Sequence, residues 1–318
     1  MAAISGNNGF AFGVSSRKKK AKGIDVMKQA FLASFYLSLA AGIWGGMYVV
    51  SKYVLDYIPP FTLVWLRYAV ALIVLGAVAV AKRERPPKNG RDWGMIITVG
   101  IIGYVVSISL QFVGTKWSNA HTASLITAST PAFVVLFARW LIGEALTWRK
   151  LGALLLATFG VIVIVGLGGG EESTFLGNIC LVGAAVTWAL LSVLVKIASA
   201  RLSVFSITTY AIFVALIGMT PMMLAEGPGL AASHWSVPVA LGVLYLGVVS
   251  TAGAFFLWNK GMEMIDAGVG SLFFFFQPLV GSLFGRLFLQ EQLDVSFWLG
   301  GALIAAGVAV AVRSEQSA

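Results

Sequence analysis

The sequence predicts an all-α membrane protein with ten transmembrane helices arranged as two inverted five-helix repeats. The first observation is composition: of the 318 residues, 58% are hydrophobic and only 11% are charged, whereas soluble globular proteins carry roughly 25% charged residues. The second is that apolar runs of about 20 residues, the length that spans a bilayer, recur along the chain. The third is a set of residues in the first half that returns in the same order in the second half.

Prolines, glycines and charged residues divide the apolar sequence into the ten expected spans. They are residues 29–52, 61–81, 94–114, 120–142, 148–167, 176–199, 204–224, 236–258, 267–289 and 294–313. The loops between them are too short to form a soluble catalytic domain, which argues against an enzyme. The predicted domains are a disordered basic N-terminus at 1–28, a first repeat at 29–167, a linker at 168–175, a second repeat at 176–313 and a tail at 314–318.

The N-terminal segment precedes the first span and is rich in Gly, Ser and Lys. Such a composition is typical of disordered chain. The apolar run that follows is longer than the 7–15 residues of a secretory signal, so we predict a helix that is retained. An organellar transit peptide stays open as an alternative, because no acidic residue precedes Asp25.

The basic residues gather in alternate loops. The net charge of +9 would also suit nucleic-acid binding, but most of the Lys and Arg residues fall near 17–28, 82–91 and 149–150, on one side of the expected membrane. The connections on the other side hold mainly acidic residues such as Asp56 and Glu226. The positive-inside rule therefore predicts cytoplasmic termini in a cell inner (plasma) membrane and no nucleic-acid partner.

The duplication rests on residues that recur at fixed offsets. At an offset of 144 the recurring pairs are Trp44 and Trp188, Lys52 and Lys196, and Phe61 and Phe205. At an offset of 147 they are Pro131 and Pro278, Arg139 and Arg286, and Glu144 and Glu291. Because five is an odd number of spans, the second repeat starts on the opposite side of the membrane. Inverted repeats are common in secondary transporters, whose substrate site lies near the bilayer midplane.

The motifs WGGMYVVSKYVLDYIPPFTLVWLRY (44–68), GEALTWRKLGALLLATFGVIVIV (143–165) and QEQLDVSFWLGGALIAAGVAVAV (290–312) give the chain, over residues 29–313, a pattern that resembles the EamA-type branch of the drug/metabolite transporter superfamily. The resemblance implies ten helices in two inverted repeats and transport of small organic solutes. Bacterial aromatic amino-acid exporters are similar members, which implies a central cavity bordered mainly by helices 1, 3, 4, 6, 8 and 9. The repeats have diverged, since Ala211 stands where Arg67 would recur.

Aromatic residues on the expected cavity helices are candidates for stacking a flat substrate. They are Trp44, Tyr48, Tyr104, Trp188 and the run FFFFQP at 273–278, from which Phe276 is taken as the site candidate. Packing is the alternative, because the four consecutive phenylalanines at 273–276 cover every face of a helix.

Pro131 and Pro278 each lie 11 residues into their spans, near the expected bilayer centre. A proline there removes a backbone donor and leaves carbonyls that must find other partners. Ser129 and Thr130 precede one proline and Gln277 precedes the other. The group is either a solute site at a broken helix or a kink whose carbonyls bond to Ser and Thr.

Arg67 lies about six residues inside the second span with no acidic residue close in sequence. Intramembrane charges usually face a cavity or a partner. Arg67 therefore either attracts a substrate carboxylate or extends outward to the interface.

The remaining charged candidates are expected to act as gates or to fasten helices. Arg139 and Arg286 lie eight residues beyond the prolines, about 12 Å along a helix, which takes them to opposite surfaces. An arginine-to-glutamate contact, with Glu144 or Glu291, or a bond to exposed carbonyls is the favoured role. Lys52 lies at the outer end of the first span and Lys196 at the inner end of the sixth, where they either extend to the interface or gate the cavity.

The sequence lacks the patterns of other function classes. His121 and His234 are isolated and show no metal-ligand spacing, and Walker A, G-x-G-x-x-G and H-E-x-x-H patterns are absent. No Asp or Glu lies near the middle of a span, so nothing supports proton coupling. We expect no catalytic residues, metal or other cofactor.

These observations predict a secondary transporter that works by alternating access on a small-molecule substrate within a lipid bilayer. Export of amino acids or related compounds is the leading interpretation, and a metabolite or drug importer or facilitator is the runner-up. A membrane scaffold without transport activity and a membrane-embedded enzyme are the alternatives from other classes. No obligate protein partner is evident.

Overall fold

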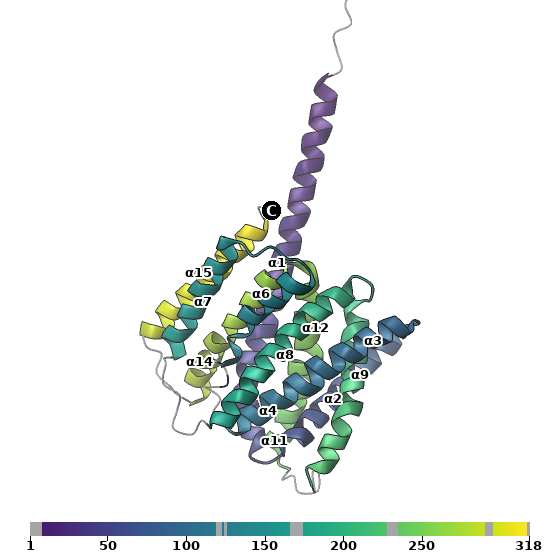
Figure 1. The fold of residues 1–318 in the computed structure, drawn as a ribbon, viewed down its shortest axis with the longest axis vertical. Helices are drawn as coiled ribbons and strands as arrows, with labels where there is room; N and C mark the ends of the chain where they lie inside the picture. Colours follow the sequence, from purple (N-terminus) through teal and green to yellow (C-terminus); the bar gives the residue numbers. More distant parts are fainter. Residues whose placement is uncertain are drawn as a thin grey trace, which may run out of the picture.

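The computed structural model describes residues 8–118, 123, 126–165, 174–227, 235–289 and 295–316. All regular elements in these ranges are helices (Figure 1). The first half holds α1 (Asn8–Leu55), α2 (Pro60–Ala81), α3 (Gly90–Thr98), η1 (Val99–Ser107), α4 (Ile108–Lys116), α6 (Thr130–Leu141) and α7 (Trp148–Val165). The second half holds α8 (Phe175–Ser199), α9 (Val204–Ala225), α11 (Val237–Leu244), η2 (Tyr245–Gly253), α12 (Ala254–Met264), α13 (Ala267–Ser271), η3 (Leu272–Phe275), α14 (Phe276–Leu289) and α15 (Val295–Gln316).

Six helical segments of the described chain are long and apolar enough to cross a membrane. They are Met27–Leu55, Pro60–Ala81, Gly90–Lys116, Phe175–Ser199, Val204–Ala225 and Val237–Met264. Shorter apolar helices cover Thr130–Leu141, Ala267–Gly281 and Trp298–Arg313. The prediction of an all-α, multi-pass membrane protein is therefore confirmed.

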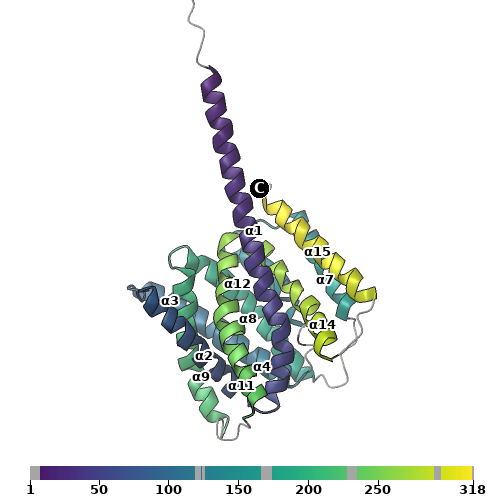
Figure 2. The same ribbon diagram turned by 180° about the vertical axis from the view of Figure 1, so that it is seen from behind.

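The N-terminal segment differs from the prediction. Residues 8–28 were expected to be disordered, but α1 begins at Asn8 and runs without a break to Leu55. In Figures 1 and 2 the N-terminal part of α1 extends well beyond the other helices. The segment contains no proline, and its Lys, Arg and Ala residues are good helix formers, so nothing in its backbone stops the apolar helix from extending.

Short polar residues and prolines determine where several helices begin. Pro60 lies in the first turn of α2, where a missing N–H is tolerated. The hydroxyls of Thr174 and Ser203 cap α8 and α9 by accepting the N–H groups of Gly177 and Ser206, each at 3.1 Å. Each such cap satisfies a backbone donor that has no partner within its helix.

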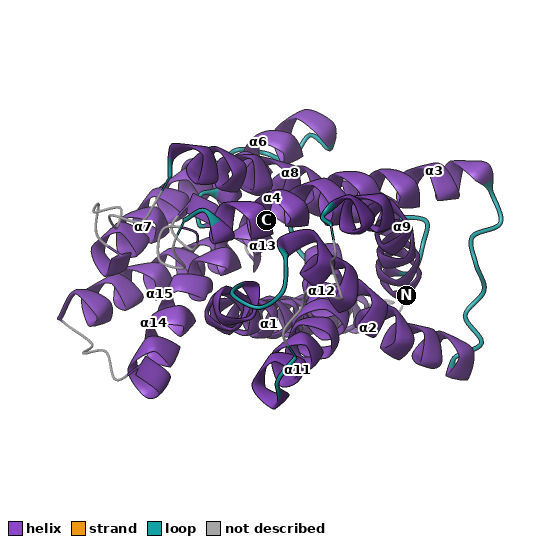
Figure 3. Cartoon of the chain, turned by 90° about the horizontal axis from the view of Figure 1, so that it is seen from below, coloured by secondary structure: helices purple, strands orange, loops and turns teal. Residues whose placement is uncertain are grey.

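The contacts between helices follow a reciprocal pattern across the two halves. α1 packs on α12 and α14, while α8 packs on α4, η1 and α6. α2 packs on α9, and α7 packs on α15. Figure 3, which views the bundle from below, shows α7, α14 and α15 on one side, α3 and α9 on the other, and α1 and α12 between them.

Glycines permit the closest of these approaches. A methyl group added at Gly45 would lie 2.7 Å from the Gln277 carbonyl oxygen, so only glycine lets α1 reach α14. In the α7 and α15 pair, Gly160 and Gly307 have the same function: an added methyl group would lie 2.6 Å from Gly300 O and 2.8 Å from Ala153 O, respectively.

Each half contains a wide helical turn that the hydropathy pattern did not predict. η1 follows α3 and η2 follows α11, and both segments are π-helical over nine residues. Such turns often mark functional sites, because the wider helix shifts the direction of the side chains that follow. η1 and η2 flank the cavity described below.

Candidate functional site

A cavity with an empty volume of about 390 Å³ lies between the two halves. Helices α1, α2, η1, α4 and α6 line it from the first half, and α8, α12, η3 and α14 line it from the second. Its lining residues are Trp44, Met47, Tyr48, Arg67, Ser107, Ile108, Gln111, Thr127, Thr130, Ala184, Ala185, Trp188, Phe255, Phe274 and Gln277. Arg67 is the sole charged residue among them, so no carboxylate of the described residues lines the cavity.

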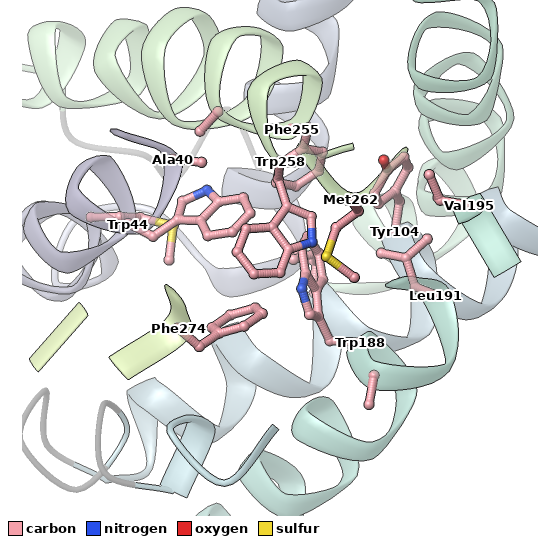
Figure 4. Close-up of a cluster of buried hydrophobic side chains, with 14 of the residues drawn as sticks. Ala40, Trp44, Tyr104, Trp188, Leu191, Val195, Phe255, Trp258, Met262 and Phe274 are labelled. Carbon is pink, nitrogen blue, oxygen red and sulfur yellow. The ribbon is translucent and has the colours of Figure 1, made fainter. Parts of the chain in front are cut away.

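The lining residues Trp44, Trp188, Phe255 and Phe274 belong to a cluster of buried hydrophobic side chains (Figure 4). The Trp44 ring lies 5.3 Å from the Trp188 ring in an edge-on arrangement and stacks on Phe274 at 5.8 Å, both measured between centroids. Trp258 extends this cluster, with its centroid 5.3 Å from that of Trp44 and 4.4 Å from that of Phe274. These flat faces suit an apolar or aromatic ligand.

The two cavity tryptophans differ in their hydrogen bonding. The Trp44 Nε1 donates to the Ser250 carbonyl oxygen at 3.0 Å. The Trp188 Nε1 is buried and has no acceptor among the described residues. Because buried donors almost always have partners in native proteins, the Trp188 indole N–H is available to a ligand.

Arg67 is fully buried in the wall of the cavity, with 0% of its surface exposed. Its Nε donates to Thr251 Oγ1 at 2.7 Å, and its guanidinium lies over the rings of Phe112 and Phe255 at 5.0 and 5.7 Å from their centroids. Within the described chain it forms no ion pair with a carboxylate. Of the two sequence-based alternatives, the side chain thus faces the cavity instead of extending to the interface.

Hydroxyl and amide groups line the remaining part of the cavity. Tyr48 OH lies 2.7 Å from Thr127 Oγ1 and accepts from Gln111 Nε2 at 2.9 Å. The Gln277 side chain is buried, lines the cavity and makes no side-chain hydrogen bond within the described part of the chain. Its amide is therefore a second group that is free to bind a ligand.

The structure brings six of the predicted candidates to the cavity: Trp44, Tyr48, Arg67, Thr130, Trp188 and Gln277. Five others lie outside its lining: Tyr104, Ser129, Pro131, Phe276 and Pro278. Tyr104 supports the wall from behind, since its ring stacks on Phe255 at 4.7 Å and its hydroxyl accepts from Asn259 Nδ2 at 2.9 Å. Ser129 is exposed and donates to Ile126 O, and Phe276 stacks on Phe273.

Pro131 is the start of a helix in this structure and does not expose its backbone to the cavity. It lies in the first turn of α6, where its missing N–H costs little. The carbonyl of Thr127, four residues earlier, accepts a hydrogen bond from Thr130 Oγ1 at 2.6 Å. This arrangement matches the alternative of a bend whose carbonyls bond to threonine. Pro278 is buried just after the tight turn of η3.

Eight lining residues were not predicted: Met47, Ser107, Ile108, Gln111, Thr127, Ala184, Ala185 and Phe255. A ninth, Phe274, belongs to the predicted run at 273–278, although Phe276 was the site candidate taken from that run. Gln111 had a detectable signal, because a glutamine inside an apolar span needs a polar partner. The small and apolar residues had none, since they do not differ from ordinary packing residues in sequence.

The charged candidates lie at the ends of the helices. Glu144 accepts the N–H groups of Ala267 and Gly268 at 2.8 and 3.1 Å and so caps α13. Lys196 donates to the carbonyls of Ile265 and Met262, at the end of α12, and its Nζ lies 3.8 Å from Glu144 Oε1. We call this group of Glu144, Lys196 and the start of α13 the terminal clasp, because its contacts join the ends of helices.

The expected contact between Arg139 and Glu144 does not form. Arg139 is exposed on α6, whereas the Glu144 carboxylate turns toward α13. Two backbone N–H groups at a helix N-terminus are a better partner for a carboxylate than a solvated arginine. The side chain of Arg286, and the residues Glu291, His121 and His234, lie outside what the structure describes.

Lys52, the counterpart of Lys196, caps a helix in the same way. Its Nζ donates to Ser118 O at 2.9 Å, just beyond the end of α4. Ser118 and Met262 are separated by the same 144 residues as the two lysines, so the two contacts are equivalent. Within the described residues no group of three His, Cys, Asp or Glu side chains is arranged to hold a metal ion.

Comparisons with known proteins agree with these features. The model of the EamA-like transporter family matches the chain twice, at residues 31–166 and 175–313. An uncharacterised transporter of Bacillus subtilis strain 168, YetK, is 28% identical over 309 residues, which cover 94% of this chain and 92% of YetK. A probable terminal-alkyne amino-acid exporter of Streptantibioticus cattleyicolor is 27% identical over 87% of this chain and 92% of its own length. A solved crystal structure shares the fold with a TM-score of 0.73 at 22% identity, covering 90% of this chain and 98% of the other.

Proposed function

Because the chain belongs to the EamA-like transporter family, we propose that it is a secondary transporter that exports amino acids or related small metabolites by alternating access around the central cavity. The family and the relatives support the broader statement that it is a membrane transporter of small metabolites. One relative named as a probable amino-acid exporter favours amino acids as the substrate class.

The architecture that we propose is ten transmembrane helices in two inverted repeats. The two family matches divide the chain at the linker. The reciprocal packing of α1 and α8, the paired segments η1 and η2, and the equivalent contacts of Lys52 and Lys196 all support a two-fold relation between the halves. The positive-inside pattern supports a plasma membrane orientation with both termini in the cytoplasm.

The observation that carries the proposed function is the buried cavity between the halves. Residues of both halves line it. The terminal clasp joins the halves at helix ends, because Glu144 of the first half binds the start of α13 and lies 3.8 Å from Lys196 of the second. We propose that this clasp closes the cytoplasmic side of the cavity.

Transport itself is the test. Purified protein in liposomes would be loaded with an unlabelled amino-acid mixture, and the uptake of labelled amino acids by exchange would be measured. The cavity variant Ala185→Phe places a ring where a buried alanine lines the cavity. The control variant Val182→Phe places the same ring on the exposed side of the same helix, where Val182 is 44% exposed.

We expect exchange with wild type and Val182→Phe and loss of at least about tenfold in rate with Ala185→Phe. Folding of each variant would be checked by gel filtration and thermal unfolding in detergent. If a broad panel of solutes fails to move while the wild-type protein stays folded, the proposed function is wrong. If Ala185→Phe is folded and transports normally, the cavity is not the transport pathway.

A further inference from the structure

The guanidinium of Arg67 has more donors than the protein supplies acceptors. A guanidinium has five N–H donors, and the described chain offers three acceptors: Thr251 Oγ1 at 2.7 Å, Ser250 Oγ at 3.5 Å and Met47 Sδ at 3.8 Å. Only the first is a hydrogen bond of ordinary length, and sulfur is a weak acceptor. Within the described residues the guanidinium also forms no ion pair with a carboxylate, although a buried charge without a counter-ion is strongly unfavourable.

Two further donors line the same cavity without acceptors. The Trp188 Nε1 has no partner, and the residue is only 8% exposed. The Gln277 amide also makes no side-chain hydrogen bond among the described residues, and the residue is 3% exposed. Together with Arg67, these groups come from α8, α14 and α2, so three separate helices contribute residues with unsatisfied donors to the lining of one cavity. Such a site is complementary to an anion with several acceptor oxygens.

The rest of the cavity indicates what the anion is attached to. Its lining includes the rings of Trp44, Trp188, Phe255 and Phe274, which offer apolar faces to the body of a ligand. Among the described residues no Asp or Glu lines it, so a ligand ammonium group would find aromatic faces and neutral dipoles but no carboxylate there.

From these observations we infer that the cavity selects its ligand by a carboxylate bound at Arg67, with an aromatic or bulky apolar body, and that an α-amino group is not required. This inference rests on the proposed function and narrows it, because the substrate class becomes organic carboxylates that include, but are not limited to, amino acids. The planar guanidinium binds the carboxylate with two parallel hydrogen bonds, and the rings pack on the body.

Binding to the purified protein in detergent tests the inference independently of transport. Calorimetry would compare four ligands with one ring: phenylalanine, 3-phenylpropionate without the amine, phenylalaninamide without the carboxylate charge, and phenethylamine without the carboxyl group. We expect phenylalanine and 3-phenylpropionate to bind with Kd values within about fivefold of each other. We expect the other two to bind at least about tenfold more weakly.

The variants separate charge from structure. Arg67→Gln should raise the Kd of both carboxylates by about 10- to 100-fold, equal to about 1.4 to 2.8 kcal/mol. Arg67→Lys keeps the charge without the planar fork and should give an intermediate Kd. Arg91→Gln, at an exposed arginine in α3, should change nothing. Trp188→Phe should weaken the carboxylates by a smaller factor and leave phenethylamine unaffected.

Two results would overturn the inference: phenylalaninamide binding as tightly as phenylalanine, or carboxylate affinity unchanged in a folded Arg67→Gln protein. Binding of chloride at Arg67, with no competition from the carboxylates, would also overturn it. If the Arg67→Gln protein does not fold, the Kd values of the Arg67→Lys protein and of the four ligands with the wild-type protein still test whether the carboxylate binds at Arg67. Carboxylate binding without transport in liposomes would refute the proposed function and leave the carboxylate site supported. Transport of neutral solutes at an unchanged rate in the Arg67→Gln protein would refute the carboxylate site and leave a transport function supported.

Discussion

Arg67 in α2 and Ala211 in α9 occupy matched positions of the two halves, and both are fully buried. Arg67 extends its guanidinium into the cavity wall. Ala211 is not among the lining residues of the cavity. Its backbone packs against η1, where a methyl group added at Gly100 would lie 2.8 Å from Ala211 O. The two helices therefore keep similar packing but have different chemistry.

The packing on the Arg67 side follows the same scheme. A methyl group added at Gly247 of η2 would lie 2.5 Å from Val70 Cβ and 3.2 Å from Arg67 O. Each π-helical segment thus holds a glycine against the backbone of α2 or α9. The comparison shows that a duplicated fold preserves its close backbone contacts while placing its charge in one half, which makes the cavity asymmetric.

The largest expected effect comes from moving the charge to the other half. Ala211→Arg should destabilise the protein by about 3–5 kcal/mol, because it places an unpaired charge and a long side chain in a filled space. The midpoint of thermal unfolding in detergent measures this, with Ala211→Ser as the control of small volume. A stable Ala211→Arg protein that binds a second carboxylate would show instead that the two halves are chemically interchangeable.

The glycine contacts should have the next largest effect. Gly100→Ala and Gly247→Ala should each cost about 1–3 kcal/mol by overpacking. Gly76→Ala is the matched control, since nothing lies within 4 Å of a methyl group added there and alanine favours a helix over glycine by about 1 kcal/mol. If the unfolding midpoint falls for only one of the variants Gly100→Ala and Gly247→Ala, the two halves do not pack in an equivalent way at these glycines.

The terminal clasp permits a test of how the two faces differ. Glu144→Gln removes the charge that faces Lys196 and the N-terminus of α13, and we expect it to favour opening of the terminal face by about 1–2 kcal/mol. The probe is Ser192→Cys in a Cys180→Ser background, because Ser192 is a buried residue of α8. With Glu144→Gln added, this thiol should react about tenfold faster with a thiol reagent added from that face than it does without Glu144→Gln.

Glu263→Gln is the control for the clasp, because Glu263 pairs with Lys260 on the same face but does not touch α13. Equal labelling rates in Glu144→Gln and wild type would remove the clasp from the gating mechanism.

The smallest effects distinguish the carboxylates at the ends of α2 and α9. Glu226 accepts Phe61 N, Thr62 N and Thr62 Oγ1 at 2.8–3.0 Å, whereas Glu84 accepts Ser203 Oγ alone at 2.8 Å at an exposed site. Glu226→Gln should therefore cost about 1 kcal/mol and Glu84→Gln less than about 0.5 kcal/mol. Unfolding midpoints of the two variants would rank them, and the reverse order would contradict these contacts.

The apolar runs of the sequence predicted the helices well because hydropathy reports directly which segments avoid water. Val204–Ala225, for example, differs from the predicted 204–224 by a single residue at its end. The helix before Met27 and the π-helical segments were not predicted, since neither changes the apolar character of the chain. Hydropathy also does not indicate which side chains contact one another. Glu144 was expected to contact the nearby Arg139, but it binds the N-terminus of α13, 123 residues away in sequence.

The candidate site was predictable where residues are chemically unusual for a membrane span. Arg67, Trp44 and Gln277 belong to this group, and all three line the cavity. The environment of Arg67 was not predictable, because Thr251 and Phe112 come from other helices. Ala184 and Ala185 define the volume of the cavity by being small, a property that sequence alone does not distinguish from close helix packing.

The single charge of the cavity has an electrical consequence. With an amine-free monocarboxylate bound, the site has no net charge, whereas the empty site, like a site that holds a zwitterionic amino acid, keeps the positive charge of Arg67. A membrane voltage acts on a moving charge by about 2.3 kcal/mol per 100 mV. If the loaded and empty forms both reorient across the membrane, voltage would therefore act on the empty form and leave the form loaded with an amine-free carboxylate almost unaffected, so the return step would generate the current for such a substrate.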